Sequence, residues 1–251
     1  MQSQALVDSL TRDSLSAAEL ATYRERGWVL VRGLLARSAI AATAADVRAV
    51  LAARNMADSY LAQSTEYLAD SPIHRLVASP QLRRLAGQAM AGEARLYMPF
   101  TAVKGPGQGE FTFHQDGQYT QFDGPGLNCW FSLVACTPAN GCLRLVSGTH
   151  RAGMVPWKES PQCPGHRTMV EQPTQWEDVV MEPGDCCIFD RMTVHGSGPN
   201  GSADPRIAYA VQFHRSDTKA FFDGTWQALT ERPRWSAGPV AAFTDAAQRG
   251  E

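Results

Sequence analysis

The sequence predicts a mainly β fold, with strands in a sandwich or barrel that follows a helical N-terminal part. After Gly92, short apolar segments alternate with Gly- and Pro-containing turns, a spacing typical of such folds. Before Gly92, apolar residues recur at helical spacing. The 251 residues are 44% hydrophobic, enough for a substantial core. We expect a single domain, residues 1–251, with a helical part at about 1–92, a β core at about 93–215 and a C-terminal extension at 216–251.

The helical part begins with a capped helix at residues 16–26. Ser16 can cap its N-terminus, Glu19 follows three residues later as in a capping box, and Gly27 can end it. Further along, the Ala-rich composition and the position of Pro80 favour two more helices. The other elements expected here are a buried strand at 28–33 and helices at 38–54 and 80–91.

The β core is predicted from apolar, β-prone segments bounded by turn residues. Residues 153–178 contain several prolines and few apolar runs, so we expect a loop or a lid over a site. The expected strands are 94–103, 110–115, 128–136, 142–146, 186–189 and 206–213.

Charge and composition argue against several classes of protein. The net charge of −2 offers no electrostatic basis for binding nucleic acid or an anionic membrane. No apolar run approaches the roughly 20 residues that span a bilayer, and the N-terminus lacks the pattern of a secretory signal. None of the six cysteines forms a Cys-x-x-Cys pair, which favours free thiols in a reducing compartment. We therefore expect a cytoplasmic protein.

A candidate metal site lies in the sequence His114-Gln115-Asp116 together with the distant His195. Side chains two positions apart on an extended strand point to the same side, so His114 and Asp116 can reach one ion. Two imidazoles and one carboxylate are the facial set that holds Fe(II) and leaves other positions open. Arg206 follows His195 after a Gly/Pro-rich loop and could bind a carboxylate in bidentate fashion.

Several motifs extend this pattern over most of the chain. They are HQDGQY at 114–119, Trp130, NGCLRLVSGTHRAG at 140–153, PGD at 183–185, HGSGPN at 195–200 with Arg206, and the opening SAAELATYRERGWVLVRGLL at 16–35. Together they resemble the phytanoyl-CoA dioxygenase family of Fe(II)/2-oxoglutarate-dependent oxygenases over roughly residues 15–215. The resemblance implies a double-stranded β-helix core, the cupin-like jelly roll, with flanking N-terminal helices.

The resemblance also implies a set of site residues. The metal ligands would be His114, Asp116 and His195. The residues that bind the cosubstrate would be Arg206 and Ser197 at the distal carboxylate of 2-oxoglutarate, Trp130 in the pocket wall, and Phe100. The implied cofactors are Fe(II), 2-oxoglutarate and O₂.

The implied reaction is oxidation, most simply hydroxylation, of an unactivated C–H bond in a small molecule, with release of succinate and CO₂. Asp116 favours oxygen transfer over halogenation, because related halogenases have Gly or Ala at this position. We expect a natural-product or other biosynthetic intermediate as substrate, and a monomer or homodimer.

Two other functions use the same ligands. A zinc-dependent hydrolase is one, since Zn²⁺ binds such sites more tightly than Fe(II). A non-catalytic metal-binding jelly roll that serves as a binding module is the other. Arg206 and Ser197 argue against the hydrolase, because hydrolysis does not need a site for a dicarboxylate. The binding module predicts no 2-oxoglutarate turnover and a dispensable Arg206.

Overall fold

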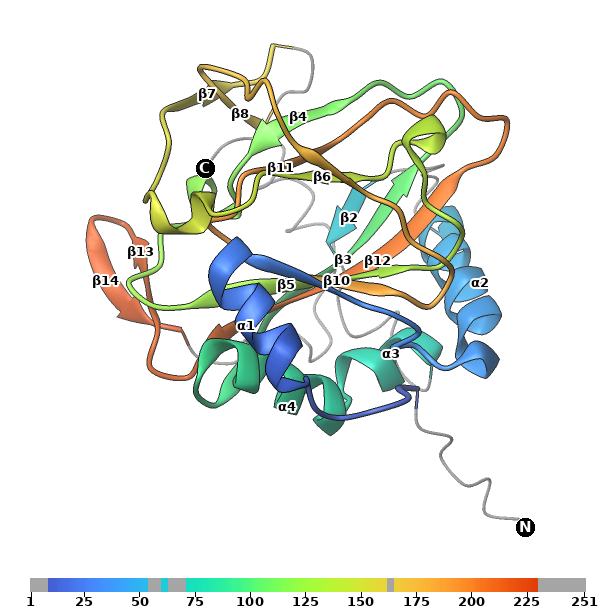
Figure 1. Cartoon of the computed structure of the whole chain (residues 1–251), viewed down its shortest axis with the longest axis horizontal. Helices are drawn as coiled ribbons and strands as arrows, with labels where there is room; N and C mark the ends of the chain where they lie inside the picture. Colours follow the sequence, from blue (N-terminus) through green and yellow to red (C-terminus); the bar gives the residue numbers. More distant parts are fainter. Residues whose placement is uncertain (1–8, 54–59, 63–70, 162–164, 230–251) are drawn as a thin grey trace.

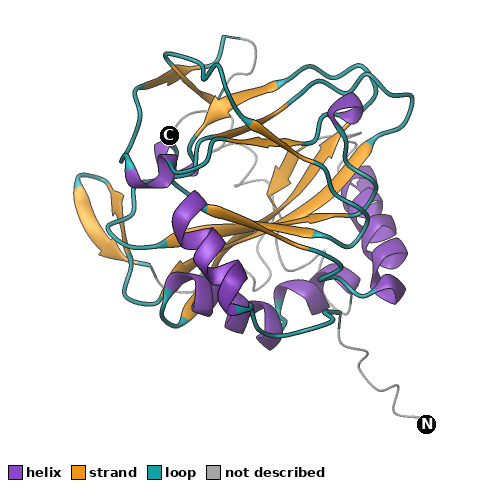
Figure 2. Cartoon of the chain, viewed as in Figure 1, coloured by secondary structure: helices purple, strands orange, loops and turns teal. Residues whose placement is uncertain are grey.

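Two antiparallel sheets face each other in the computed structural model, and helices cover the outer face of the larger one (Figures 1 and 2). The structure describes residues 9–53, 60–62, 71–161 and 165–229. Cys163 and the end of the C-terminal extension, 230–251, lie outside these residues. No helix within the described ranges is long and apolar enough to cross a membrane.

The larger sheet has the strand order β1-β10-β5-β12-β3-β2. Its central strand, β12, pairs along its length with both β3 and β5. The strands are β1 (Trp28–Val31), β10 (Cys186–Asp190), β5 (Gly126–Ser132), β12 (Arg206–Arg215), β3 (Ala94–Lys104) and β2 (Tyr60–Ala62). The N-terminal part, expected to be mainly helical, therefore also contributes β1 to the main sheet.

The smaller sheet has the order β4-β11-β6-β9 and carries both histidines of the predicted metal site. Its strands are short, β4 (Phe111–His114), β11 (His195–Ser197), β6 (Leu143–Leu145) and β9 (Glu177–Val179). Apolar side chains of both sheets, including Phe100, Trp130 and Leu145, fill the space between them.

The helices pack on the opposite face of the larger sheet. They are α1 (Ala17–Arg26), α2 (Arg37–Ala53), α3 (Pro72–Val77) and α4 (Pro80–Met90). Ser16 and Glu19 form the expected capping box of α1, and Gly27 ends it with φ of 80°. The other two expected helices begin and end within a residue of the predicted positions.

Strand alternation decides which side chains face the helices and which face the interior of the jelly roll. On β10, Cys186 joins the helix-covered core and Cys187 the core between the sheets, as expected of neighbouring residues on a strand. On β12, Tyr209 packs toward the helices, whereas Ala208 and Ala210 face the interior. The five described cysteines are buried free thiols, in line with the sequence prediction.

Three predicted segments differ from the structure. The strand expected at 128–136 ends at Ser132, after which the chain crosses to the smaller sheet and Cys136 pairs with Met181. The segment 153–178 is more than a loop, because it contains the hairpin β7 (Trp157–Glu159) and β8 (Arg167–Met169) and the start of β9. In the C-terminal extension, β13 (Lys219–Phe222) and β14 (Thr225–Ala228) form a hairpin.

Candidate active site

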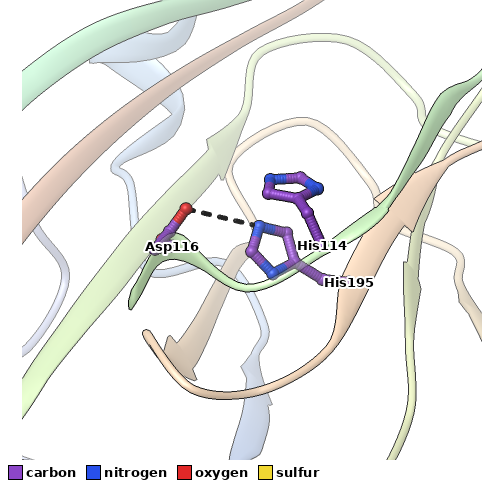
Figure 3. A group of neighbouring side chains, drawn as sticks. All are labelled: His114, Asp116 and His195. Carbon is purple, nitrogen blue, oxygen red and sulfur yellow. Dashed lines mark ion pairs between the residues drawn. The ribbon is translucent and has the colours of Figure 1, made fainter. Parts of the chain in front are cut away.

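The three predicted metal ligands converge at one end of the jelly roll. His114 ends β4 and is the direct cross-strand neighbour of His195, which begins β11. Ligand atoms of His114, Asp116 and His195 all lie within 4.8 Å of one another. The His195 Nε2 atom lies 3.6 Å from Asp116 Oδ1, with the ring of His114 beside that of His195 (Figure 3).

The route by which Asp116 reaches this position differs from the prediction. His114 and Asp116 were expected on one strand, but β4 ends at His114 and Asp116 begins a 3-10 turn, η2 (Asp116–Gln118). Gln115 between them keeps extended backbone angles, φ −120° and ψ 139°. The alternation of side chains therefore continues one residue past the strand, and the two ligands still face the same side.

Both histidines are oriented by a hydrogen bond from Nδ1 to a backbone carbonyl. The Nδ1 atom of His114 lies 3.0 Å from the carbonyl of Thr112, and that of His195 lies 2.9 Å from the carbonyl of Thr193. A carbonyl can only accept, so Nδ1 of each ring donates and Nε2 is the nitrogen left for a ligand bond. Burial lowers the pKa of His114 well below its ordinary value, and the neighbouring His195 adds to this shift. The imidazole is therefore neutral at neutral pH, as metal binding needs.

Asp116 is oriented by a residue that sequence reasoning missed. Gln212, on β12, donates a hydrogen bond of 3.0 Å from Nε2 to Asp116 Oδ2, which leaves Oδ1 facing His195. Arg191 donates to the backbone carbonyl of Asp116 at 3.1 Å. Two imidazoles and one oriented carboxylate fit a divalent first-row metal and are the donor set typical of Fe(II) oxygenases.

A buried cation lies farther along the interior of the jelly roll. Arg206, the first residue of β12, is 5% exposed and forms no salt bridge with a carboxylate in the described part of the chain. Its guanidinium donates to the carbonyls of Gly141, at 2.8 Å, and Ala102, at 3.3 Å. The Nε atom has no partner among the described residues. Burial lowers the pKa of Arg206, because the charged form is poorly solvated there. A carboxylate ligand would supply the missing countercharge.

The predicted cosubstrate residues Phe100 and Trp130 lie on the inner face of the larger sheet, between the triad and Arg206. Phe100 on β3 and Trp130 on β5 are the two cross-strand neighbours of Ala210, so an alanine lies between two aromatic side chains on the inner face. The Arg206 guanidinium lies 5.1 Å from the ring centre of Trp130. Ser197 is also buried here, and its hydroxyl accepts a hydrogen bond of 2.9 Å from Lys104.

A third histidine lies near the triad, although the sequence held no signal for it. His166 follows the first strand of the β7–β8 hairpin, and its ring centre lies 4.7 Å from that of His114. Its Nδ1 atom is hydrogen-bonded to the hydroxyl of Tyr119. Burial lowers the pKa of His166 to about 4. His166 is not one of the three residues whose ligand atoms cluster in the described part of the chain.

The aromatic residues that could shape a substrate pocket do not share one location. The ring of Tyr119 lies near that of His114, and its hydroxyl is hydrogen-bonded to His166. Phe213 faces the helices and is buried in the core between helices and sheet, so it cannot line the interior. Trp157 is exposed on β7, where the guanidinium of Arg167 lies over its ring. Of these three, only Tyr119 lies next to the predicted metal ligands.

The model of the family described as phytanoyl-CoA dioxygenase (PhyH) matches residues 23–208. The chain belongs to the phytanoyl-CoA dioxygenase family. This membership confirms the resemblance seen in the motifs, and the expected enzyme class with its iron, 2-oxoglutarate and O₂ is the one that this resemblance implies. It argues against the zinc hydrolase and the non-catalytic binding module.

Three relatives illustrate the range of this family. The methylphosphonate hydroxylase of Gimesia maris is 31% identical over 144 residues, 57% of this chain and 54% of the relative. The probable phytanoyl-CoA dioxygenase of Caenorhabditis elegans is 34% identical over 45% of this chain and 40% of the relative. The ectoine dioxygenase of Bordetella parapertussis is 27% identical over 77% and 73%. This chain thus matches only about half of the first two relatives' length.

Solved structures of lower sequence identity share the fold. The epimerase SnoN in complex with Fe³⁺, α-ketoglutarate and nogalamycin RO has a TM-score of 0.70 at 22% identity, over 86% of this chain and 96% of SnoN. EvdO2 of Micromonospora carbonacea with 2-oxoglutarate has a TM-score of 0.70 at 18% identity, over 90% and 98%. EctD of S. alaskensis has a TM-score of 0.67 at 18% identity, over 94% of each chain. The predicted jelly roll with flanking helices is confirmed.

Proposed function

We propose that this protein is an Fe(II)/2-oxoglutarate-dependent oxygenase that hydroxylates an unactivated C–H bond of a small biosynthetic intermediate. The observation that carries the proposal is the pairing of two features on the inner face of one jelly roll. One end holds the ligand set His114, Asp116 and His195, and the other holds the buried, uncompensated cation Arg206. Such a pairing suits a cosubstrate that chelates a metal at one end and carries a carboxylate at the other.

The proposed metal ligands are His114, Asp116 and His195. When bound, Fe(II) with 2-oxoglutarate and O₂ would supply the oxidising chemistry, and succinate and CO₂ would be released. The carbonyls of Thr112 and Thr193 hold the two imidazoles, and Gln212 holds the carboxylate. Because these contacts fix the orientation of all three side chains, little reorganisation would be needed for the metal to bind.

The proposed residues for 2-oxoglutarate are Arg206, Ser197, Trp130 and Phe100. Arg206 would bind the distal carboxylate in an interior where water screens the charges poorly, which strengthens the pair. The rings of Trp130 and Phe100, on either side of Ala210, would limit access of water to the cosubstrate. The 2-oxo acid end would then be directed toward the metal.

A cavity next to Asp116 supports a small substrate. It has a volume of about 290 Å³, and Gly117 forms part of its wall. Met154, Met192, Phe122 and Trp226 make the lining largely apolar, with Arg191 as its charged member. This volume is at the lower end of the range for small-molecule sites, so it suits a compact metabolite better than an acyl-coenzyme A. The names of the relatives that act on ectoine and methylphosphonate agree with a small substrate.

The test is 2-oxoglutarate turnover by protein loaded with Fe(II) under anaerobic conditions and then exposed to O₂. We expect succinate in the presence of Fe(II), none with Zn²⁺ in its place, and faster release when a small molecule that fits the cavity is added. A panel of amino acids, small acids and natural-product scaffolds would identify the substrate class by stimulated consumption of 2-oxoglutarate. Absence of succinate across the panel, or turnover without O₂, would contradict the proposal.

A further inference from the structure

Two cations are direct neighbours at the far end of the inner face. Lys104, the last residue of β3, is the cross-strand partner of Arg206 at the start of β12, and each is 5% exposed. Within the described ranges, neither forms a salt bridge with a carboxylate. Burying two like charges side by side is costly unless an anion compensates them. The arrangement therefore favours an anionic ligand at this end of the interior.

The ammonium of Lys104 is close to the predicted cosubstrate residue Ser197. It donates to Ser197 Oγ at 2.9 Å, to the carbonyl of Gly109 at 2.9 Å and to the carbonyl of Gly198. An ammonium can only donate, so the Ser197 oxygen accepts, and the hydroxyl proton of Ser197 must point elsewhere. Among the described residues, none accepts a hydrogen bond from the Ser197 hydroxyl. The hydroxyl proton of Ser197 is therefore available to an acceptor, and its oxygen is bound to the neighbour of Arg206 on the sheet.

We propose that Lys104 is a positioning residue that orients the Ser197 hydroxyl toward the distal carboxylate of 2-oxoglutarate and shares the charge of that carboxylate with Arg206. The inference rests on the proposed function and deepens it, because it explains a preference for a 2-oxo acid with a second carboxylate. Binding of the carboxylate would relieve the repulsion between the two cations. A 2-oxo acid with an apolar end would leave both charges uncompensated.

A purely structural role for Lys104 makes a different prediction. Its hydrogen bonds also connect the turn after β3 to the loop after β11, through Gly109 and Gly198. If this connection were its whole contribution, removal of the ammonium would weaken every 2-oxo acid equally. If Lys104 instead interacts with the distal carboxylate, removal of the ammonium should weaken the binding only of a ligand that has this carboxylate.

The experiment compares 2-oxoglutarate with 2-oxovalerate, which has the same chain length and no distal carboxylate. The Kd of each is measured by anaerobic titration of Fe(II)-loaded wild type, Lys104→Met and the exposed control Lys219→Met. For Lys104→Met we expect the Kd of 2-oxoglutarate to rise on the order of tenfold to a hundredfold, the effect of losing a charge-assisted contact. The Kd of 2-oxovalerate should change by less than about twofold, and Lys219→Met should change neither. Lys104→Arg, which keeps the charge, should restore part of the 2-oxoglutarate affinity.

Equal weakening of both ligands, or no change in either, would overturn the role of Lys104. Wild-type protein that binds 2-oxovalerate and 2-oxoglutarate equally would do the same. Failure of Fe(II)-loaded wild type to bind any 2-oxo acid would instead contradict the proposed function, so the two failures are distinguishable.

A measurement on wild type alone covers the case in which Lys104→Met does not fold. Burial, with repulsion from Arg206 and Arg144, lowers the pKa of Lys104 to about 7. The other groups that face it are Glu110 and Cys142, and burial raises the pKa of Cys142 to about 12, so this thiol stays protonated. A bound carboxylate would raise the pKa of Lys104. The preference for 2-oxoglutarate over 2-oxovalerate should therefore decline as pH rises above about 7, by up to tenfold per pH unit. A preference independent of pH would overturn the inference.

Discussion

Replacement of Gln212 tests whether the tertiary structure prepares Asp116 for metal binding. Gln212→Leu removes the donor to Asp116 Oδ2 and keeps a side chain of similar size on the inner face of β12. Asp116 would then lose the contact that leaves Oδ1 directed toward His195. We expect weaker metal binding with the fold retained.

The magnitude follows from the type of bond that is lost. A hydrogen bond to a charged acceptor contributes about 1.5–3 kcal/mol, which corresponds to roughly a tenfold to 150-fold change in an equilibrium constant. Loss of an outer contact to a metal ligand costs about 10- to 100-fold in metal affinity, in agreement with that range. The metal-free protein should lose little stability, because the Asp116 side chain is 13% exposed and water can replace the amide.

The assay is the Kd for Fe(II) or Co(II), measured anaerobically by calorimetry for wild type, Gln212→Leu and Gln118→Leu. Gln118 is a matched control, because it is also buried, lies two residues after Asp116 and, among the described residues, donates to the carbonyl of Val155 rather than to a metal ligand. An unchanged Kd in Gln212→Leu would refute the reasoning. An equal loss in Gln118→Leu would show that the effect is not specific to the carboxylate of Asp116.

Three further predictions concern the site. Asp116→Ala should nearly abolish metal-dependent 2-oxoglutarate turnover while the circular dichroism spectrum stays that of wild type, and full hydroxylation by this variant would disprove the ligand assignment. Arg206→Ala should raise the Kd for 2-oxoglutarate by about two orders of magnitude, since two charge-assisted bonds are lost, and an unchanged Kd would remove Arg206 from the cosubstrate site. The pKa of His166 is lowered to about 4, so the unfolded chain binds a proton that the folded protein excludes between about pH 6.5 and 4. The free energy of unfolding should therefore fall by up to about 1.4 kcal/mol per pH unit as pH decreases through this range. In His166→Leu, denaturant titrations at several pH values should show a smaller dependence of this free energy on pH. An identical dependence in both proteins would contradict the assignment to His166.

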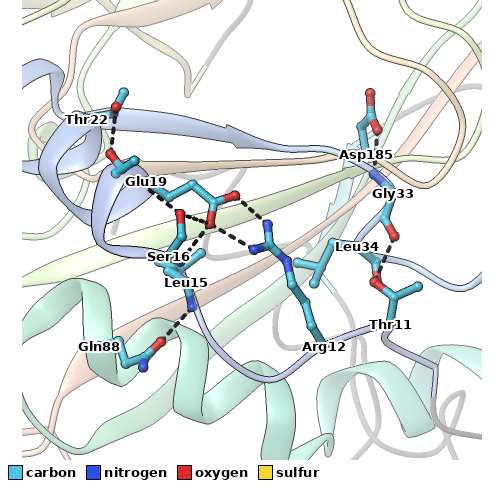
Figure 4. Close-up of polar contacts among 11 residues, drawn as sticks. Thr11, Arg12, Leu15, Ser16, Glu19, Thr22, Gly33, Leu34, Gln88 and Asp185 are labelled. Carbon is cyan, nitrogen blue, oxygen red and sulfur yellow. Dashed lines mark hydrogen bonds and ion pairs between the residues drawn. The ribbon is translucent and has the colours of Figure 1, made fainter.

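Local features of the fold could be read directly from the sequence, as the first helix shows. The side chain of Ser16 and that of Glu19 satisfy each other's backbone donors at the N-terminus of α1, and Glu19 also pairs with Arg12 (Figure 4). These residues lie within one turn or just before it, so a short pattern contains the complete interaction. The connection from Leu15 to the Gln88 side chain on α4, in the same figure, joins residues far apart in the chain and left no signal.

The interior face of β12 could have been inferred further than it was. Arg206, Ala208, Ala210 and Gln212 alternate along one strand, so the inward direction of Arg206 also implies that of Gln212. A buried glutamine on the same face as the predicted arginine was a usable signal for a polar contact near the metal ligands. The identity of its partner, Asp116, depends on how β12 lies relative to the turn after β4.

By itself, the sequence determined the family, the combination of a β core with N-terminal helices, and the capped first helix. It also determined the residue types that can hold iron and a dicarboxylate. These depend on motifs and periodicities that act within a few residues. Only the tertiary structure decided that Asp116 begins a 3-10 turn, that Gln212 orients it and that Lys104 lies beside Arg206. Each of these follows from the register and packing of strands distant in the chain, and local propensity does not specify such pairings.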